Sequence, residues 1–208
     1  MALDINALKS KLNSFKRVGG GDRDASIWKP KEGKTVIRIV PWKDNPENPF
    51  IELYFHYLGN KTHLSPLSYG NRDPIAEFAD ALRSDQSRDP KERYAEARPF
   101  MPKLRTYIPV IVRGEEDKGV QVWAFGKQVY QRMLGFFLDE EVGDILSPTE
   151  GFDLKVSITK AQGKQFNDTM VDPARRPSKL HEDTKVMANW LENIPNIDDM
   201  YRLKSTAE

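Results

Sequence analysis

Residues 103–113 alternate between two kinds of side chain, and this alternation constrains the fold more than any other feature of the chain. Even positions such as Ile108 are mostly apolar, whereas odd positions include Lys103, Arg105 and Tyr107. Successive side chains of a β-strand point to opposite faces, so the run predicts a strand with one core face and one cationic, aromatic face. No acidic residue interrupts it.

A second alternating run, at residues 120–125, follows after a short turn. Its small residues Val122 and Ala124 are predicted to face the core. If the two strands pair as a hairpin, Trp123 and Phe125 then share a face with the cations of the first run. The alternative is that these rings belong to the core of a sheet buried on both faces. The interleaved cations speak against that alternative, because an unpaired cation is costly to bury.

The other periodic segments predict a mainly β fold with helical additions. Strands are expected, the first two as a hairpin, at residues 35–40, 50–58 and 152–158. Helices are expected at residues 74–82, 90–97, 127–138 and 184–193. A five- to six-stranded antiparallel barrel with a helical insertion (74–99) before a middle strand, and with a C-terminal helix, fits an OB-fold. A basic, proline-bracketed loop is expected at residues 172–177.

Composition divides the chain into four segments. Residues 1–17 predict an amphipathic helix with four bases against one acid, and residues 18–32 predict a flexible linker. A frayed terminal helix is the plain alternative for the first segment. Residues 33–181 are expected to form the core domain, and residues 182–208 the last helix and the start of a tail. The bases of the N-terminal arm are Lys9, Lys11, Lys16 and Arg17.

Charge is balanced overall but separated along the sequence. Lys and Arg number 32 and Asp and Glu 31, so the net charge of +1 excludes attraction of a polyanion by the molecule as a whole. Residues 139–153 hold six acids and no base, whereas residues 155–179 hold six bases and two acids. A surface for a polyanion must therefore be local, and residues 139–153 should face away from it.

Most signatures of an enzyme or a metal protein are missing from the sequence. It has no cysteine, which excludes disulfides and Cys-containing metal sites, and its three histidines are predicted to be structural or exposed. It has neither a glycine-rich phosphate loop nor a nucleophile elbow, and no apolar run approaches the ~20 residues of a membrane span. We expect no catalysis, metal or cofactor. One alternative is a metal-dependent nuclease using Asp144, Asp153 and Lys155.

Rings and bases on one face predict binding of single-stranded nucleic acid. A single strand exposes both phosphates and base faces, so a groove with cations and aromatic rings binds it with little sequence preference. The first hypothesis is therefore a non-enzymatic coat for single-stranded DNA. Besides the nuclease, a further alternative is an adaptor that recruits replication proteins through the arm or the last helix.

Three blocks of sequence resemble the single-stranded-DNA-binding (gene 32) proteins of T-even bacteriophages and their relatives. They are Val36-Ile37-Arg38-Ile39-Val40-Pro41, Trp123-Ala124-Phe125-Gly126-Lys127-Gln128-Val129-Tyr130 and Ile194-Pro195-Asn196-Ile197-Asp198-Asp199. The resemblance implies an OB-fold that binds single-stranded DNA in phage replication, recombination and repair, in the cytoplasm of the infected bacterial host. It also implies self-association along DNA through the N-terminal arm, with phage replication and recombination proteins as further partners.

The resemblance implies a DNA cleft lined by Arg38, Lys103, Arg105, Tyr107, Trp123, Phe125 and Lys127. Further DNA contacts are expected from Trp42, Tyr54, Tyr57, Arg175 and Arg176.

The sequence departs from that family in two respects. Its best-known members hold zinc with Cys and His in the insertion, whereas this chain has no cysteine and is expected to be zinc-free, with the apolar helix Ile75 to Leu82 replacing the packing that metal provides. Relatives also end in a long acidic tail, and the expectation is that such a tail has been removed here.

Overall fold

The structure of the chain is a computed structural model that describes residues 26–139, 141–160, 163, 167–201 and 203. The predicted arm (1–17), with Lys9, Lys11, Lys16 and Arg17, lies outside the described residues, as does most of the predicted linker. The strands are β1 (Ile27–Trp28), β2 (Gly33–Ile39), β3 (Ile51–Leu58), β4 (Lys61–Leu64), β5 (Lys103–Val112), β6 (Gln121–Phe125), β7 (Phe152–Thr159) and β8 (Asp168–Pro177). The helices are α2 (Pro74–Ser84), α3 (Pro90–Ala97), α4 (Lys127–Phe137) and α5 (Thr184–Glu192), with 3₁₀ turns η1 (Pro66–Tyr69) and η2 (Glu116–Lys118).

The strands form one mixed sheet that is organised around β5. Its order is β1-β6-β5-β2-β7-β8, and β3 pairs with both β4 and β5. Strand β3 pairs with residues 103–107 of β5 and β2 with residues 110–112, so both pair with the same long strand. The predicted hairpin of residues 35–40 with 50–58 is therefore wrong, because the loop between them carries the chain from one end of β5 to the other. Within the described strands the path ends at β1 and β8, so closure into a barrel is not confirmed.

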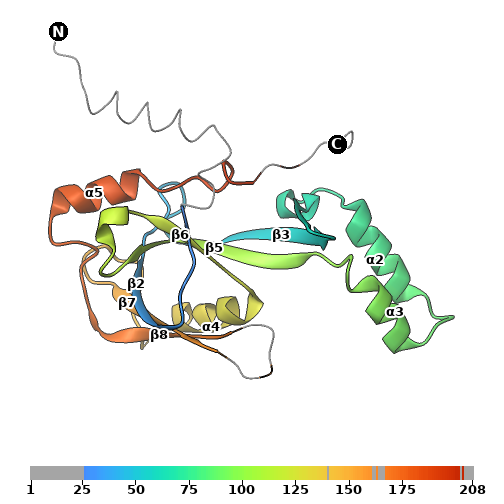
Figure 1. Cartoon of the computed structure of the whole chain (residues 1–208). Coiled ribbons are helices and arrows are strands. Elements are labelled where there is room, and N and C mark those ends of the chain that lie inside the picture. Colours follow the sequence, from blue (N-terminus) through green and yellow to red (C-terminus); the bar gives the residue numbers. More distant parts are fainter. Residues whose placement is uncertain (1–25, 140, 161–162, 164–166, 202, 204–208) are drawn as a thin grey trace, which may run out of the picture.

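Two regions share strand β5 (Figure 1). The body contains β1, β2, β6, β7, β8, α4 and α5, and the wing contains β3, β4, η1, α2 and α3. The wing projects to one side, and only β5 among the strands runs through both (Figure 1). Among the strands, β5 is therefore the element that connects the two regions.

The sequence signals for helices are confirmed in the wing. The carboxylate of Asp73 accepts hydrogen bonds from the backbone N–H groups of Ile75 and Ala76, and Pro74 occupies the first turn of α2. Asp89 caps α3 in the same way. A side-chain acceptor before a helix satisfies N–H groups that have no partner within the helix, and proline in the first turn loses no hydrogen bond.

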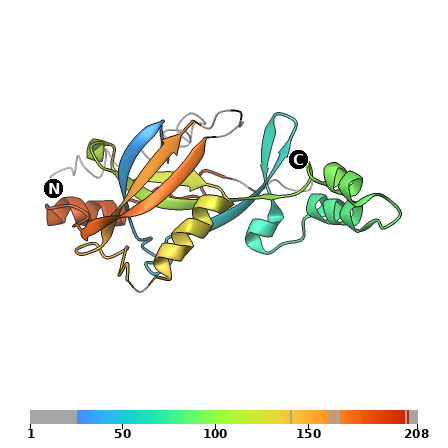
Figure 2. The same cartoon turned by 90° about the horizontal axis from the view of Figure 1, so that it is seen from below.

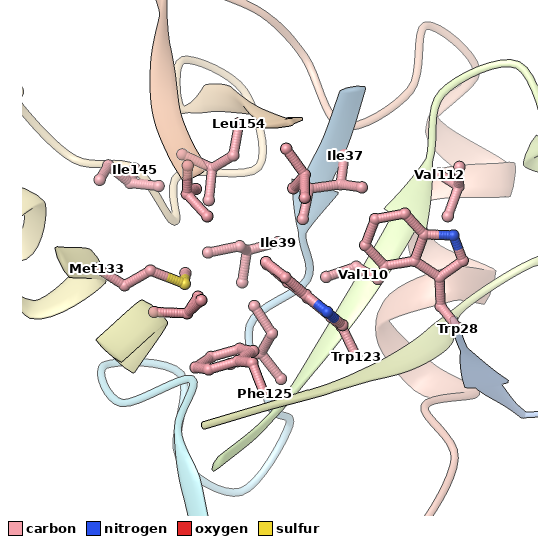
Figure 3. Packing of buried hydrophobic residues seen from close by; sticks show 14 of the residues in the cluster. Trp28, Ile37, Ile39, Val110, Val112, Trp123, Phe125, Met133, Ile145 and Leu154 are labelled. Atoms are coloured by element: carbon pink, nitrogen blue, oxygen red, sulfur yellow. The ribbon is translucent and has the colours of Figure 1, made fainter. Parts of the chain in front are cut away.

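Helix α4 lies across one face of the sheet (Figure 2), and the main hydrophobic core fills the space between this helix and the even face of β5 (Figure 3). Trp123 packs edge-on against Trp28 at a centroid distance of 5.4 Å and lies 4.7 Å from Phe125, and Met133 of α4 joins the same cluster. Ile108 pairs directly with Trp123 across the ladder, so both side chains enter this core.

The opposite, odd face of β5 is covered over most of its length by C-terminal residues. Trp190 of α5 packs with Ile111 in one cluster, and Ile197 and Met200 pack with Tyr107 in another. The segment after α5 runs across β6 and β5 towards β3 (Figure 1). Strand β5 is thus buried on both faces except at its start, where the burial pattern becomes exposed.

The predicted loop at residues 172–177 is wrong, because these residues belong to strand β8. Residues 172–177 continue the ladder with β7 rather than forming a loop, because Lys155 pairs with Asp172 and Phe152 with Pro177. The basic pair Arg175 and Arg176 therefore lies on an edge strand. Across the described part of the chain, no helix is long and apolar enough to cross a membrane.

Candidate nucleic-acid interface

An exposed cationic and aromatic surface lies at the start of β5, where the body meets the wing. Lys103 and Arg105 are exposed on the odd face of the strand. Tyr57 of β3 is 37% exposed beside them; its hydroxyl accepts a hydrogen bond from Arg105 Nε at 3.3 Å, and Lys103 Nζ lies 5.3 Å from its ring centroid. We call Tyr57, Lys103, Arg105 and Lys127 the cationic patch.

Lys127 joins this patch because α4 begins directly after β6. Phe125 pairs with Thr106, so the next residue, Gly126, lies beside Arg105; a Cβ added to Gly126 would be 3.9 Å from the guanidinium. Gly126 precedes α4 and has no side chain with which to cap its first turn. The free N–H groups and the positive end of the helix dipole therefore add to the attraction for anions.

Three packed aromatic rings lie beneath the patch, and we call them its floor: Phe55, Tyr107 and Tyr201. Tyr107 is buried, with its ring 6.4 Å from Phe55 and 5.5 Å from Tyr201 between centroids. Burial, and then the hydrogen bond with Tyr201, raise the pKa of the Tyr107 phenol well above its ordinary value. The phenol therefore stays neutral and adds no negative charge beneath the cations.

A C-terminal strap, defined as residues 194–201, holds the floor in place. Ile197 and Met200 are buried against Leu53, Phe55 and the other residues of this cluster. In the wing, the hydroxyl of Tyr69 donates to the carboxylate of Asp198 at 3.2 Å. The strap follows α5, which packs on the body, and reaches the wing, so it ties the two regions together beside the patch.

The structure corrects the prediction for the two rings of β6. Trp123 and Phe125 are 1% and 4% exposed and lie in the main core. The hairpin pairs Thr106 with Phe125 and Ile108 with Trp123, so the rings lie on the even face of β5. A register that differs by one residue reverses the face of every side chain, and the alternative of a sheet buried on both faces is the correct one here.

Tyr107 shares a face with Lys103 and Arg105, as predicted, but is only 2% exposed. The strap covers it, so in this structure its ring supports the patch instead of facing a ligand.

Arg38, also expected to contact DNA, is wholly buried in the body. Its guanidinium donates to the carbonyl of Ser147 at 2.5 Å and to Ser178 Oγ at 3.3 Å, and lies 3.8 Å from the carboxylate of Asp153. Burial lowers the pKa of Arg38 to about 10, while Asp153 acts in the opposite direction. The expectation that Arg38 lines an open cleft is therefore wrong, because this cation holds together the loop before β7.

The remaining predicted contacts are spread over the molecule. The indole N–H of Trp42 donates to the carbonyl of Pro49 at 2.7 Å, and this partly buried ring packs on the cluster beneath the patch. Tyr54 is half-buried on the opposite face of β3 from Tyr57. Arg175 and Arg176 are exposed on β8, which two strands separate from β5. Trp42 therefore lies beneath the patch, whereas Tyr54, Arg175 and Arg176 do not share a site with Arg105.

The geometry does not support the nuclease triad. Asp153 accepts hydrogen bonds from Arg113 at 2.8 and 3.2 Å, so its carboxylate is already engaged. Asp144 accepts from the backbone N–H groups of Leu146 and Ser147. Among the described residues, no group of three or more His, Cys, Asp and Glu could hold a metal ion.

A buried polar cluster fixes the wing. His56 Nε2 lies 2.8 Å from the Asp73 carboxylate, and Ser65 donates to the same oxygen. Burial alone raises the pKa of Asp73, but the hydrogen bonds from Ser65, His56 and the α2 backbone lower it overall. The predicted apolar helix Ile75 to Leu82 provides less packing than expected, since Phe78 is 50% exposed.

Sequence reasoning missed several residues that shape the site. Tyr201 and Asp198 are brought to the patch by the strap, and Gly126 places the start of α4 beside Arg105. Asp73, which caps α2, also meets His56, and no local sequence pattern indicates this contact. These contacts join segments that are far apart in the chain.

Comparison with known proteins bears on what this surface binds. The family model described as gp32 DNA binding protein like matches residues 31–207, which is most of the chain. No curated protein sequence matches it.

Proposed function

Because the chain belongs to the gp32 DNA-binding protein-like family, we propose that it is a non-enzymatic binding protein for single-stranded DNA and that the cationic patch is its contact surface. One observation carries the proposal: an exposed ring lies between exposed cations at the junction of body and wing. Within the described residues, Lys103, Arg105 and Lys127 form no ion pair with an acid, so their charge is available to phosphates.

The patch matches the two exposed features of a single strand. Lys103, Arg105 and Lys127 offer charge to the backbone, and the uncapped start of α4 adds N–H donors. Tyr57 offers a face on which a base can stack, with little dependence on the base. Duplex DNA hides its base faces, so an exposed ring at the centre of the patch favours single strands.

The proposal extends to the fold and the biological role that the resemblance implies. The curved sheet around β5 is proposed to be a variant of the five- to six-stranded OB-fold, with the wing as its insertion. The protein is proposed to coat DNA cooperatively through its N-terminal arm during phage replication, recombination and repair in the host cytoplasm. Phage replication and recombination proteins are its proposed further partners.

Titration of labelled oligo(dT) at several salt concentrations, followed by fluorescence anisotropy, tests this function. Arg105→Ala is expected to reduce the slope of log K against log salt by about 0.7, which corresponds to one phosphate contact. Tyr57→Ala is expected to remove about 1–3 kcal/mol of stacking energy, or roughly a 5- to 150-fold loss of affinity.

Arg83→Ala is the matched control, because Arg83 is an exposed arginine in the wing that pairs with Asp80. Its affinity and salt slope should equal those of the wild type. Normal binding by both Arg105→Ala and Tyr57→Ala would remove the patch as the site, and failure of the wild type to bind any single strand would remove the proposed function.

A further inference from the structure

A small pocket lies at the end of the body where the η2 turn joins β5 to β6. Its volume is about 190 Å³, below the range of about 300–1,000 Å³ that is common for sites of organic ligands. The end of β1, the segment that follows it and the start of β2 form one side of the pocket, and the end of β5, the η2 turn and the start of β6 form the other. The pocket therefore has room for a small ligand or for one group of a larger ligand.

Buried side chains of the main core close the inner side of this pocket. Trp28 and Val112, which lie at one edge of the core in Figure 3, both line it. Gln121 also lines it and pairs with Val110 across the ladder of β5 and β6, so its side chain lies on the same even face. A charged ligand beside such buried residues interacts more strongly with nearby charges than it does in open water.

One buried hydrogen-bond donor in this pocket has no partner. Gln121 is only 6% exposed, and its Nε2 amide group forms no hydrogen bond with any described residue. Most buried polar side-chain atoms are hydrogen-bonded, because an unsatisfied donor has given up its bonds to water without replacement. An amide Nε2 group is a donor only, so the group that satisfies it must be an acceptor. The position of Gln121 therefore indicates a ligand with acceptor atoms.

Lysines line the same pocket and make it attractive to anions. Lys31 and Lys118 are exposed and come from its two sides, and Lys29 lines it as well. The one acid among the described residues that line it is Glu115, which accepts a hydrogen bond from Lys118 Nζ at 2.6 Å. This hydrogen bond, and after it the charges of Lys118 and Lys31, lower the pKa of Glu115. Three bases thus accompany a single acid, and the local potential favours a negatively charged ligand.

The donors of this pocket match the chemistry of phosphate. The η2 turn is already ordered, because the backbone N–H groups of Lys118 and Gly119 donate to the carbonyls of Glu115 and Glu116, both at 3.0 Å. A phosphate group carries negative charge and several strong acceptor oxygens, so it can accept from an amide and from ammonium groups on different segments at once. We propose that this pocket binds a phosphate group through the Gln121 amide, Lys31 and Lys118.

This phosphate pocket is separate from the cationic patch. Val112 is the last residue of β5 and Lys103 the first, so the two sites lie about 30 Å apart along the strand. Inorganic phosphate and the terminal phosphate of a DNA strand present the same group, and the experiment below distinguishes these sources. The inference does not depend on the proposed function, since binding of inorganic phosphate requires no DNA.

Proton–nitrogen correlation NMR of the full chain tests the pocket directly. Inorganic phosphate is added at constant ionic strength, with chloride as the replaced anion, and the side-chain amide signal of Gln121 is identified by its loss in Gln121→Met. This signal should move with phosphate and reach a plateau. The backbone signals of the η2 turn, which remain in every variant, give the affinity. We expect an affinity loss of about tenfold in Gln121→Met, which removes the buried donor, and of about threefold in Lys31→Ala, which removes an exposed charge.

Lys91→Ala, which removes an exposed lysine of α3 in the wing, is the matched control and should leave phosphate affinity unchanged. Thermal unfolding without phosphate checks the fold of Gln121→Met. Its midpoint should not fall, since the amide that it loses has no partner in the chain. A lower midpoint would mean that the amide is bonded within the protein and would overturn its role. A Gln121 signal that phosphate does not move, or equal affinity of Lys31→Ala and the wild type, would overturn the whole proposal.

Short oligo(dT) with and without a terminal phosphate then identifies the source of the group. If the Gln121 signal moves more with the phosphorylated strand, the pocket binds a strand end. If it moves only with inorganic phosphate, the pocket binds the small ion, and if it moves with neither, the proposal is wrong. If the wild type binds no single strand but its Gln121 signal responds to inorganic phosphate, the proposed function fails and the phosphate pocket stands.

Discussion

The two ends of β5 differ in how far other parts of the chain cover them. This difference separates cations that can reach a ligand from cations that are buried. Over its last seven residues the strand is buried on both faces, by α4 on one side and by α5 and the strap on the other. At its start, only one face is covered and the other carries Lys103 and Arg105 in solvent. We call the start of β5 the open end, and the end that is buried on both faces the sealed end. Arg38 lies on the neighbouring strand β2 beside the sealed end and is wholly buried.

The comparison of Arg38 with Arg105 shows that a cation on a strand is not by itself a sign of a binding surface. Arg38 is neutralised by Asp153 and by carbonyl and hydroxyl acceptors, and breaking such a buried pair is costly. Arg105 donates to the Tyr57 hydroxyl and forms no ion pair with an acid among the described residues, so its charge is available to a ligand. Arg38 and Arg105 differ because distant parts of the chain cover only the first. The local sequence pattern does not contain this information.

The largest expected loss of stability comes from a substitution at the sealed end of β5. Trp123→Ala should lower the free energy of unfolding by about 3–5 kcal/mol, because it leaves a cavity in the main core. Tyr57→Ala, at the open end, should change it by only about 0.5 kcal/mol. Urea unfolding of both variants measures this. If both variants lost the same free energy of unfolding, the two ends of β5 would not differ in burial as described.

Gly151→Ala tests how tightly the loop around Arg38 is packed. An added Cβ would lie 2.5 Å from the carbonyl oxygens of Ile145 and Ser147, and closer still to the Arg38 guanidinium. Overpacking of this kind should destabilise the protein by about 3 kcal/mol. Gly135→Ala is the control, because nothing lies within 4 Å of its added Cβ in α4, and alanine should there stabilise by about 0.5–1 kcal/mol. Thermal or urea unfolding that ranks the two in the opposite order would contradict this packing.

A smaller loss of stability than at Trp123 or Gly151 is expected in the polar cluster of the wing. Asp73→Asn should lower the free energy of unfolding by about 2 kcal/mol at pH 7, since the bonds from His56 and Ser65 lose their charged acceptor. The pKa of Asp73 is lowered from its usual 3.8, so the contribution of the carboxylate is present above that pH and disappears as the pH falls through the folded value.

Urea unfolding of wild type and Asp73→Asn from pH 7 to pH 3 measures this contribution. Their difference should shrink on acidification. Asp89→Asn, which changes a helix cap without a histidine partner, should show a smaller difference that depends less on pH. A difference between wild type and Asp73→Asn that does not shrink between pH 7 and pH 3 would contradict the role of the carboxylate.

Much of the secondary structure follows from local patterns, with three exceptions that have physical causes. The α2, α3, α4 and α5 helices and the long β5 strand agree with their periodicity and caps. The two-residue β1 and the short β4 are too brief for any pattern to show. The prolines that bracket the end of β8 predict a loop, yet proline is tolerated on an edge strand.

The candidate site was predicted only in part. Lys103 and Arg105 with the ring of Tyr57 form the patch, but Trp123 and Phe125 belong to the core and Arg38 to a buried ion pair. Alternation shows that two faces exist. It does not show the register between strands, and a shift of one residue exchanges the faces.

Local patterns and composition are enough to establish the β-rich class, the helices, the absence of cysteine chemistry and the resemblance to the family. Which part of β5 is buried on both faces depends on long-range packing, because α5 and the strap return from the C-terminal end of the chain to cover its odd face. Local side-chain patterns record the chemistry available on each face of a strand. Contacts between distant segments decide which part of that chemistry stays in contact with solvent and can reach a ligand.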